Sequence, residues 1–233
     1  MTELRKIFRE SFEMLFERPQ LFLPRLVSTG VSSILIIGFI AGWVNYAQFL
    51  LSFPLVAILG AFTPVMVSSM VKNEGGNVLK KGFRDAANLW KSVAGLMLFT
   101  LFLAFVNSLP LSLGLMAYYI TGNIIFPIIG GIISLIILLT ISFGLYFVPI
   151  SIIENRSFLQ SLEDGFSTSK ENSREVVLLT LFSLAVLAAS SLVTGYLRDI
   201  GFAVFFLGRI TSAIIGTYLL VISPKYYLER AEE

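Results

Sequence analysis

Long apolar segments alternate with shorter charged segments along the chain, and this pattern predicts six membrane-spanning helices. A bilayer core about 30 Å thick requires roughly 20 apolar residues per helix. Six segments meet this requirement. The predicted spans cover roughly 21–41, 47–71, 93–118, 124–152, 176–197 and 201–222.

The lengths of the connections group these spans into three hairpins. The connections at about 42–46, 119–123 and 198–200 are very short, whereas those at 72–92 and 153–175 are long and polar. Each short connection therefore closes a helical hairpin, and the long stretches lie on the opposite side of the membrane.

The polar stretches before the hairpins have the periodicity of amphipathic helices. In ELRKIFRESFEMLF the apolar residues recur at helical spacing, and NVLKKGFRDAANLW and SFLQSLEDGFSTSK show similar stripes. Ser157 and Gln160 have the spacing of a capping box. We expect these helices either to lie at the membrane interface or to pack on the end of the bundle.

A proline near the end of each hairpin's second span indicates an internal repeat. These prolines are Pro64, Pro149 and Pro224, and LMLFTLF at 96–102 aligns with VVLLTLF at 176–182. The predicted fold is a single all-α polytopic membrane domain, 1–233. It comprises three parallel repeats of an amphipathic helix plus a two-span hairpin, at about 1–71, 72–152 and 153–233. Repeats that start on the same side predict a pseudo-threefold bundle.

Composition and charge support a membrane protein and give its orientation. The chain is 56% hydrophobic and 14% charged, against about 25% charged in soluble domains. Of its 17 Lys and Arg residues, all except Arg198 and Arg209 lie on the side of the termini and long loops. The positive-inside rule then places both termini in the cytoplasm and the chain in the cell membrane. A net charge of +2 is too small to indicate nucleic-acid binding.

Arg209 is the most informative candidate site residue, because it carries a full charge within an apolar span. Such a charge is costly unless it faces the bundle interior, finds a partner or reaches the headgroups. Counting inward along the spans places Gln48, Asn107 and Ser191 at a similar depth, and we expect them to form a polar substrate-binding layer with Arg209. The alternative is a structural arginine that bonds to helix carbonyls or to Asp199, or that reaches the outer headgroups.

Other residues favour structural roles. Arg25, in the first turn of its span, is expected to reach toward cytoplasmic phosphates. The acidic residues around 154–175 are typical of a solvated helix face. With no His and no Cys, imidazole catalysis and thiolate chemistry are excluded, and no nucleotide-binding or nucleophile motif appears. We therefore expect no enzymatic activity, no cofactor and no metal.

The stretches RPQLFLPRL (18–26) and YFVPISIIENRSFLQSLEDGFSTSKENSREVVLL (146–179) resemble a known group of proteins. The shared features are a span ending in proline, an acidic residue soon after (Glu154), an amphipathic helix and Asn172 before the next span. The chain resembles a superfamily of uncharacterised archaeal and bacterial membrane domains, including one attached to some bacterial glycerophosphodiester phosphodiesterases. The resemblance implies a helical membrane domain without an established activity.

Two functions remain open from the sequence. The first is a small transporter or channel-like protein for a polar or anionic solute or a lipid headgroup. The second is a non-transporting scaffold or accessory subunit that docks a partner or shapes the bilayer through its cytoplasmic helices. The expected partners are the lipid bilayer, a protein at the cytoplasmic face and further copies of the chain, but no nucleic acid.

Overall fold

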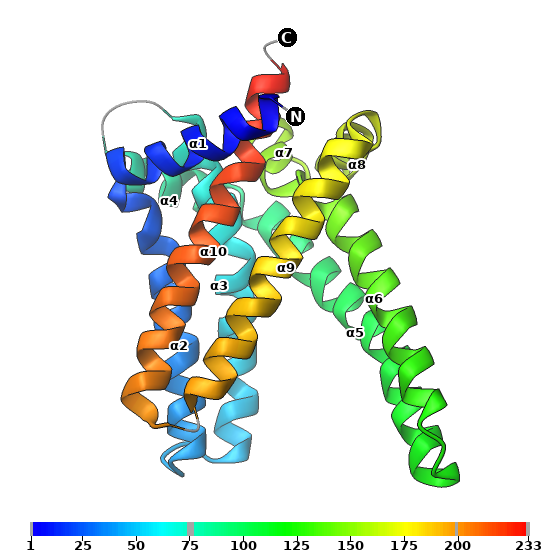
Figure 1. The fold of residues 1–233 in the computed structure, drawn as a ribbon. Coiled ribbons are helices and arrows are strands. Elements are labelled where there is room, and N and C mark those ends of the chain that lie inside the picture. The colour runs from blue at the N-terminus through cyan, green and yellow to red at the C-terminus, as the bar shows by residue number, and fades with distance from the viewer. Residues whose placement is uncertain (1, 74–76, 199, 232–233) are drawn as a thin grey trace.

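The computed structural model describes residues 2–73, 77–198 and 200–231, and these residues form helices and no strand. Six helical segments are long and apolar enough to cross a membrane, which supports the predicted multi-pass membrane protein. These segments are η1 (Pro19–Phe22) with α2 (Leu23–Ile40), α3 (Tyr46–Lys72), α5 (Trp90–Thr121), α6 (Ile125–Leu145) with α7 (Val148–Asn155), α9 (Ser173–Arg198) and α10 (Phe202–Ala231). Three further helices lie across one end: α1 (Thr2–Glu17), α4 (Val78–Asn88) and α8 (Phe158–Glu171) (Figure 1).

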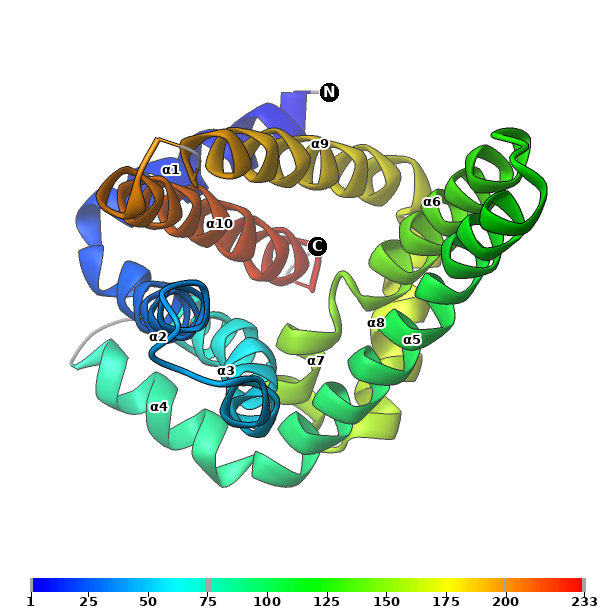
Figure 2. The same ribbon diagram turned by 90° about the horizontal axis from the view of Figure 1, so that it is seen from below.

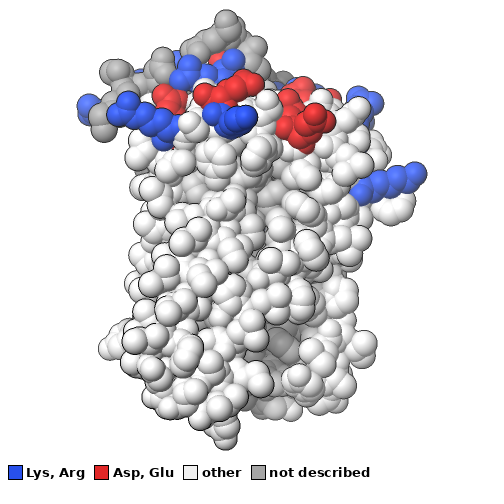
Figure 3. Space-filling view, turned by 90° about the vertical axis from the view of Figure 1, so that its right-hand side faces the viewer, with Lys and Arg blue, Asp and Glu red and all other residues white. Residues whose placement is uncertain are grey.

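Charged side chains gather at the end of the molecule that carries α1, α4 and α8, which we call the charged end. On the face seen in Figure 3, the blue and red atoms lie at this end and the surface over the spans is white. The buried core lies at this end too. It includes Val65, Met70, Ile152 and Tyr226, with Phe147 stacked 5.6 Å from the Tyr226 ring. The remaining length of the spans is largely exposed, as expected for helices solvated by lipid.

Each surface helix contacts the end of a proline-bearing helix. On α4, Asp85 accepts a 2.7 Å hydrogen bond from Ser69 of α3. On α8, Asp164 accepts a 2.9 Å bond from Ser151 of α7. The third surface helix, α1, packs on α10, where Lys225 Nζ lies 3.0 Å from a carboxylate oxygen of Glu10.

The fourth span is broken near its charged end, where the sequence predicts one continuous helix. α6 ends at Leu145, and α7 begins at Val148 with Pro149 in its first turn. Proline cannot donate to the preceding turn, which leaves backbone carbonyls without a partner. Ser223 of α10 donates a 2.6 Å hydrogen bond to the Tyr146 carbonyl at this break.

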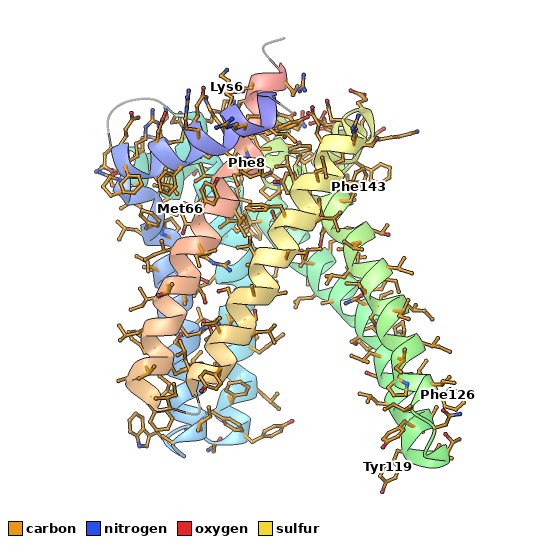
Figure 4. All side chains as sticks on the ribbon, viewed as in Figure 1. Lys6, Phe8, Met66, Tyr119, Phe126 and Phe143 are labelled. Carbon is orange, nitrogen blue, oxygen red and sulfur yellow. The ribbon has the colours of Figure 1, made fainter. Side chains whose placement is uncertain are left out.

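The α5–α6 hairpin leans away from the other four spans at the end opposite the charged end (Figures 1 and 2). Only 6% of the most apolar window of each of these two spans is buried, against 44% for α10. Within the hairpin, two glycines bring the backbones together. A Cβ at Gly114 would lie 2.5 Å from the Phe126 carbonyl oxygen, and one at Gly130 would lie 2.4 Å from that of Pro110. At the tip, Tyr119 is 91% exposed (Figure 4).

One local prediction is wrong. Ser157 precedes α8 with extended backbone, but its side chain makes no capping hydrogen bond. A capping box does occur at Asn45 and Gln48, at the start of α3. Some large apolar side chains of the surface helices are exposed: Phe16 is 73% exposed and Leu159 is 74% exposed.

Candidate functional site

Arg209 points from α10 into the bundle and bonds to two serines of α2. Its Nε donates to Ser33 Oγ at 3.2 Å, and its Nη2 donates to Ser32 Oγ at 3.0 Å. Ser32 in turn donates to the Thr29 carbonyl at 3.0 Å. Among the described residues, no carboxylate lies within salt-bridge distance of Arg209. The predicted counter-ion, Asp199, lies outside the residues that the structure describes.

Arg25 is a second arginine of the same site, and its position corrects a prediction. The sequence suggests that it reaches toward headgroups, but its guanidinium lies against Gly216 of α10, where an added Cβ would be 3.2 Å from Nε. The Nε atom is buried and has no hydrogen-bond partner within the described part of the chain. A buried polar atom of this kind is costly, which marks a position where a ligand group or water would be stabilised.

Both arginines line one cavity of about 370 Å³ between α2, α9 and α10. Its polar lining consists mainly of hydroxyl groups. Ser212 of α10 is 2.6 Å from Ser190 Oγ and 2.9 Å from Thr194 Oγ1, both of α9. The hydroxyl-bearing residues of the lining are Thr29, Ser190, Ser191, Thr194 and Ser212.

A second cavity of about 270 Å³ adjoins the first toward the charged end, and Arg25 and Leu187 line both. The three prolines singled out in the sequence, Pro64, Pro149 and Pro224, all line this second cavity. Ser68, Ser183 and Ser223 add further hydroxyl groups to it.

Together the two cavities follow most of the length of α10. The first reaches Phe205 and the second reaches Pro224. At 1.5 Å per residue, this stretch measures about 28 Å, close to the roughly 30 Å of a bilayer's hydrocarbon core. The cavities therefore place hydroxyl groups and two guanidinium groups at a series of depths within the span.

The structure brings only part of the predicted polar layer together. Ser191 lines the cavity that Arg209 lines. Gln48 does not, because it is exposed and its side chain accepts from the Asn45 backbone in the capping box. Asn107 lies in the leaning α5–α6 hairpin, where its carbonyl accepts a 2.8 Å bond from Ser134. Gln48 and Asn107 are therefore separated from Arg209.

Sequence reasoning missed the contribution of α2. Arg25, Thr29, Ser32 and Ser33 recur at spacings of four, three and one residues, which places them along one face of a helix. That polar stripe in an apolar span is a signal of the same kind as Arg209. The stripe is not evident when Arg25 is considered alone, as a residue of the first turn of its span.

The carboxylates of the charged end are largely occupied by structural contacts. Asp164 accepts from the Tyr227 hydroxyl at 2.7 Å as well as from Ser151. Glu154 pairs with Lys72 at 2.7 Å, and Glu175 accepts from Arg230 at 2.9 Å. Among the described residues, no group of three or more carboxylates is placed to hold a metal ion.

The chemistry of the arginine-lined cavity is that of an anion site. Guanidinium N–H groups and serine and threonine hydroxyls donate hydrogen bonds to oxyanions such as phosphate, sulfate or carboxylate. Among the described residues, no carboxylate lines either of the two cavities. The site is therefore equipped to bind an oxyanion.

Comparison with protein-family models, with curated proteins and with solved structures finds no match for this chain.

Proposed function

We propose that this chain is a multi-pass membrane protein that binds a small anionic group between α2, α9 and α10, and that it acts as a transporter or channel-like protein for a polar or anionic solute or a lipid headgroup. One observation carries the proposal. Arg25 and Arg209 line the same hydroxyl-rich cavity, and neither has a carboxylate partner among the described residues.

The free energy of burying these charges argues for a ligand. An arginine near the centre of a span costs about 2.5–3.5 kcal/mol on insertion scales. Neutral serine hydroxyls offset only part of this cost. Two like charges along one cavity also repel each other, and an anion between them would reverse this unfavourable term. The two cavities together are long enough to form a path for such an anion.

The membrane orientation follows from the charged end. Because Lys and Arg concentrate there, the positive-inside rule assigns that end and both termini to the cytoplasm. The proline-lined cavity then lies near the cytoplasmic side, and the Arg209 cavity lies toward the outer side.

The contacts of the surface helices support three parallel repeats. α4 contacts α3, α8 contacts α7, and α1 contacts α10, so each surface helix covers the end of a proline-bearing helix. The three prolines line one cavity. This arrangement is consistent with rotation about the membrane normal, as in other transporters built from parallel repeats. The leaning α5–α6 hairpin departs from exact threefold symmetry.

The binding test uses thermal unfolding of the purified protein in a neutral detergent. Sodium phosphate or sulfate is compared with sodium chloride at equal ionic strength. A ligand at about 100 times its Kd stabilises by about 2.7 kcal/mol, and we expect this stabilisation in the wild type. Arg25→Gln and Arg209→Gln should lose it. Arg84→Gln, which removes an exposed arginine on α4, should retain it. A wild type whose melting temperature is the same in phosphate, sulfate and chloride would overturn the proposal.

Transport is then tested separately from binding. The protein is reconstituted into liposomes, and uptake of radiolabelled phosphate and sulfate is measured with the same variants. Uptake that depends on Arg209 supports a transporter or channel. Binding without uptake limits the role to holding the anion.

A scaffold role is the second candidate, and the surface helices favour it. Phe12 and Phe16 of α1 are 54% and 73% exposed, although Leu4, Ile7 and Leu15 of the same helix are buried. The buried face anchors the helix, and the aromatic face is free to enter the interfacial region or to dock a protein partner or a second copy. If the chain is a scaffold, the double variant Phe12→Ser, Phe16→Ser should abolish its docking to a protein partner, to a second copy or to the interfacial region. Arg209→Gln should leave that docking unchanged.

A further inference from the structure

We propose that the anion is the head of an amphiphile, and that its hydrocarbon chain lies in an adjoining apolar cavity between α3, α5 and α6. This inference rests on the proposed anion site and adds the class of ligand: an anionic lipid with a phosphate or similar headgroup. The adjoining cavity measures about 350 Å³, within the range of about 300–1,000 Å³ that is typical of small-molecule sites.

The adjoining cavity is lined mainly by apolar residues. α3 contributes Ala57, Gly60 and Ala61, and α5 contributes leucines, a methionine and Thr100. The Thr100 hydroxyl donates to the Leu96 carbonyl at 2.7 Å, which satisfies its hydrogen bond within the helix. The side chains of this cavity therefore offer mainly dispersion contacts.

This apolar cavity shares a wall with the polar path. Pro64, Leu145 and Pro149 line both it and the proline-lined cavity, and Arg25 lines the latter. The order of spaces is therefore the hydroxyl-rich cavity of both arginines, the proline-lined cavity with Arg25, and then the apolar cavity. A ligand with a charged head and an apolar tail matches this order. A small inorganic anion would leave the apolar cavity unused.

The apolar cavity opens on the side of the bundle that faces lipid. Gly60 and Thr100 line it, and both are exposed on the surface of their spans. The α5–α6 hairpin leans away from α3 at the end opposite the charged end (Figures 1 and 2). A lipid tail would thus pass from the bilayer into the cavity without crossing water, while its head follows the polar path.

The contribution of the ligand's hydrocarbon chain to its affinity for the protein is large enough to measure. Relative to a probe dissolved in water, each buried methylene strengthens binding by about fourfold, so two buried methylenes already exceed about tenfold on that aqueous scale. Three probes separate the parts of the ligand: monododecyl phosphate, inorganic phosphate and dodecanol. Binding of monododecyl phosphate and dodecanol is counted by native mass spectrometry of the full chain, and all three dissociation constants are obtained from thermal stabilisation in phosphatidylcholine nanodiscs.

Glycines of matched environment provide the variants. A Cβ at Gly60 meets nothing within 4 Å, and the same holds for Gly131 on α6, which lines none of these cavities. Gly60→Leu fills the apolar cavity, and Gly131→Leu adds the same side chain elsewhere. Ala57→Leu fills the cavity from a second position, should Gly60→Leu fail to fold. Arg25→Gln removes the head contact.

We expect the wild type and Gly131→Leu to retain one monododecyl phosphate, at least about tenfold tighter than inorganic phosphate. Gly60→Leu or Ala57→Leu should lose this advantage but keep the response to inorganic phosphate, and Arg25→Gln should weaken both. Equal affinities for the two phosphates, unchanged by Gly60→Leu, would overturn this inference and leave the anion site standing. Equal binding of dodecanol and monododecyl phosphate would also overturn it. No response to either phosphate would overturn both proposals.

Discussion

Replacement of Arg209 by Met tests whether this residue serves a ligand or holds the fold together. Methionine replaces the aliphatic stem of arginine and removes the charge, whose burial costs about 2.5–3.5 kcal/mol at the centre of a span. The two lost hydrogen bonds, to Ser32 and Ser33, contribute about 0.6 kcal/mol each by the average for membrane proteins. Ser32 keeps the Thr29 carbonyl as its acceptor. The expected net effect is therefore a stabilisation of about 1–2 kcal/mol.

The assay is equilibrium unfolding by urea in micelles of a neutral detergent, followed by far-ultraviolet circular dichroism. Arg84→Met is the control, because it removes an exposed arginine outside the spans and should change the free energy of unfolding little. In the same preparation, phosphate should stabilise the wild type and leave Arg209→Met unaffected. A loss of more than about 1.4 kcal/mol, a tenfold change in the unfolding equilibrium, would instead identify Arg209 as a structural clamp and refute the reasoning.

Two further predictions concern the contacts around the site and at the charged end. Gly216→Leu should displace the Arg25 guanidinium, because even a Cβ at this position would lie 3.2 Å from Arg25 Nε. The stabilisation by phosphate should then fall as it does in Arg25→Gln. Gly30→Leu is the control, since a Cβ there has nothing within 4 Å, and it should preserve the stabilisation by phosphate. At the charged end, the hydrogen bond and charge of Lys225 hold the pKa of the Glu10 carboxyl below its ordinary value of 4.5. The resulting stabilisation is fully present above pH 4.5 and is lost as the pH falls through the lowered pKa. The difference in unfolding free energy between wild type and Glu10→Gln should shrink over that window, and a difference independent of pH would contradict this assignment.

Most of the fold can be predicted because its signals are local. Runs of apolar residues define the spans, and the very short connections force each neighbouring pair into a hairpin. The break at Tyr146–Phe147 was less accessible, because Pro149 alone is compatible with a simple kink. The Tyr146 carbonyl at the break accepts a hydrogen bond from Ser223, which lies 77 residues away in the chain. No local sequence pattern predicts a partner that is so distant.

The sequence places candidate polar residues along the spans but does not specify which helices face one another. Counting residues inward places Gln48, Asn107 and Ser191 near the depth of Arg209, yet depth does not specify which helix faces which. Asn107 belongs to a hairpin that leans away, and Gln48 is engaged in a helix cap. Only Ser191, on the helix next to α10, shares the cavity.

The inward position of Arg25 depends on a neighbour that is remote in sequence. α2 packs beside α10, and Gly216 has no side chain to exclude the guanidinium from the interior. A preference for headgroups, reasonable for an arginine in the first turn of a span, is thereby overridden by tertiary packing. The same pairing of α2 with α10 brings Ser32 and Ser33 to Arg209.

The most direct test of the central claim is a crystal structure of the protein grown in a lipid phase with sodium selenate, in which the anion is located by anomalous scattering. We predict a peak in the cavity between α2, α9 and α10, within hydrogen-bonding distance of Arg25 or Arg209, that persists in Asn107→Leu and disappears in Arg209→Met. Anomalous peaks confined to the charged end, with none in the cavity, would contradict the account.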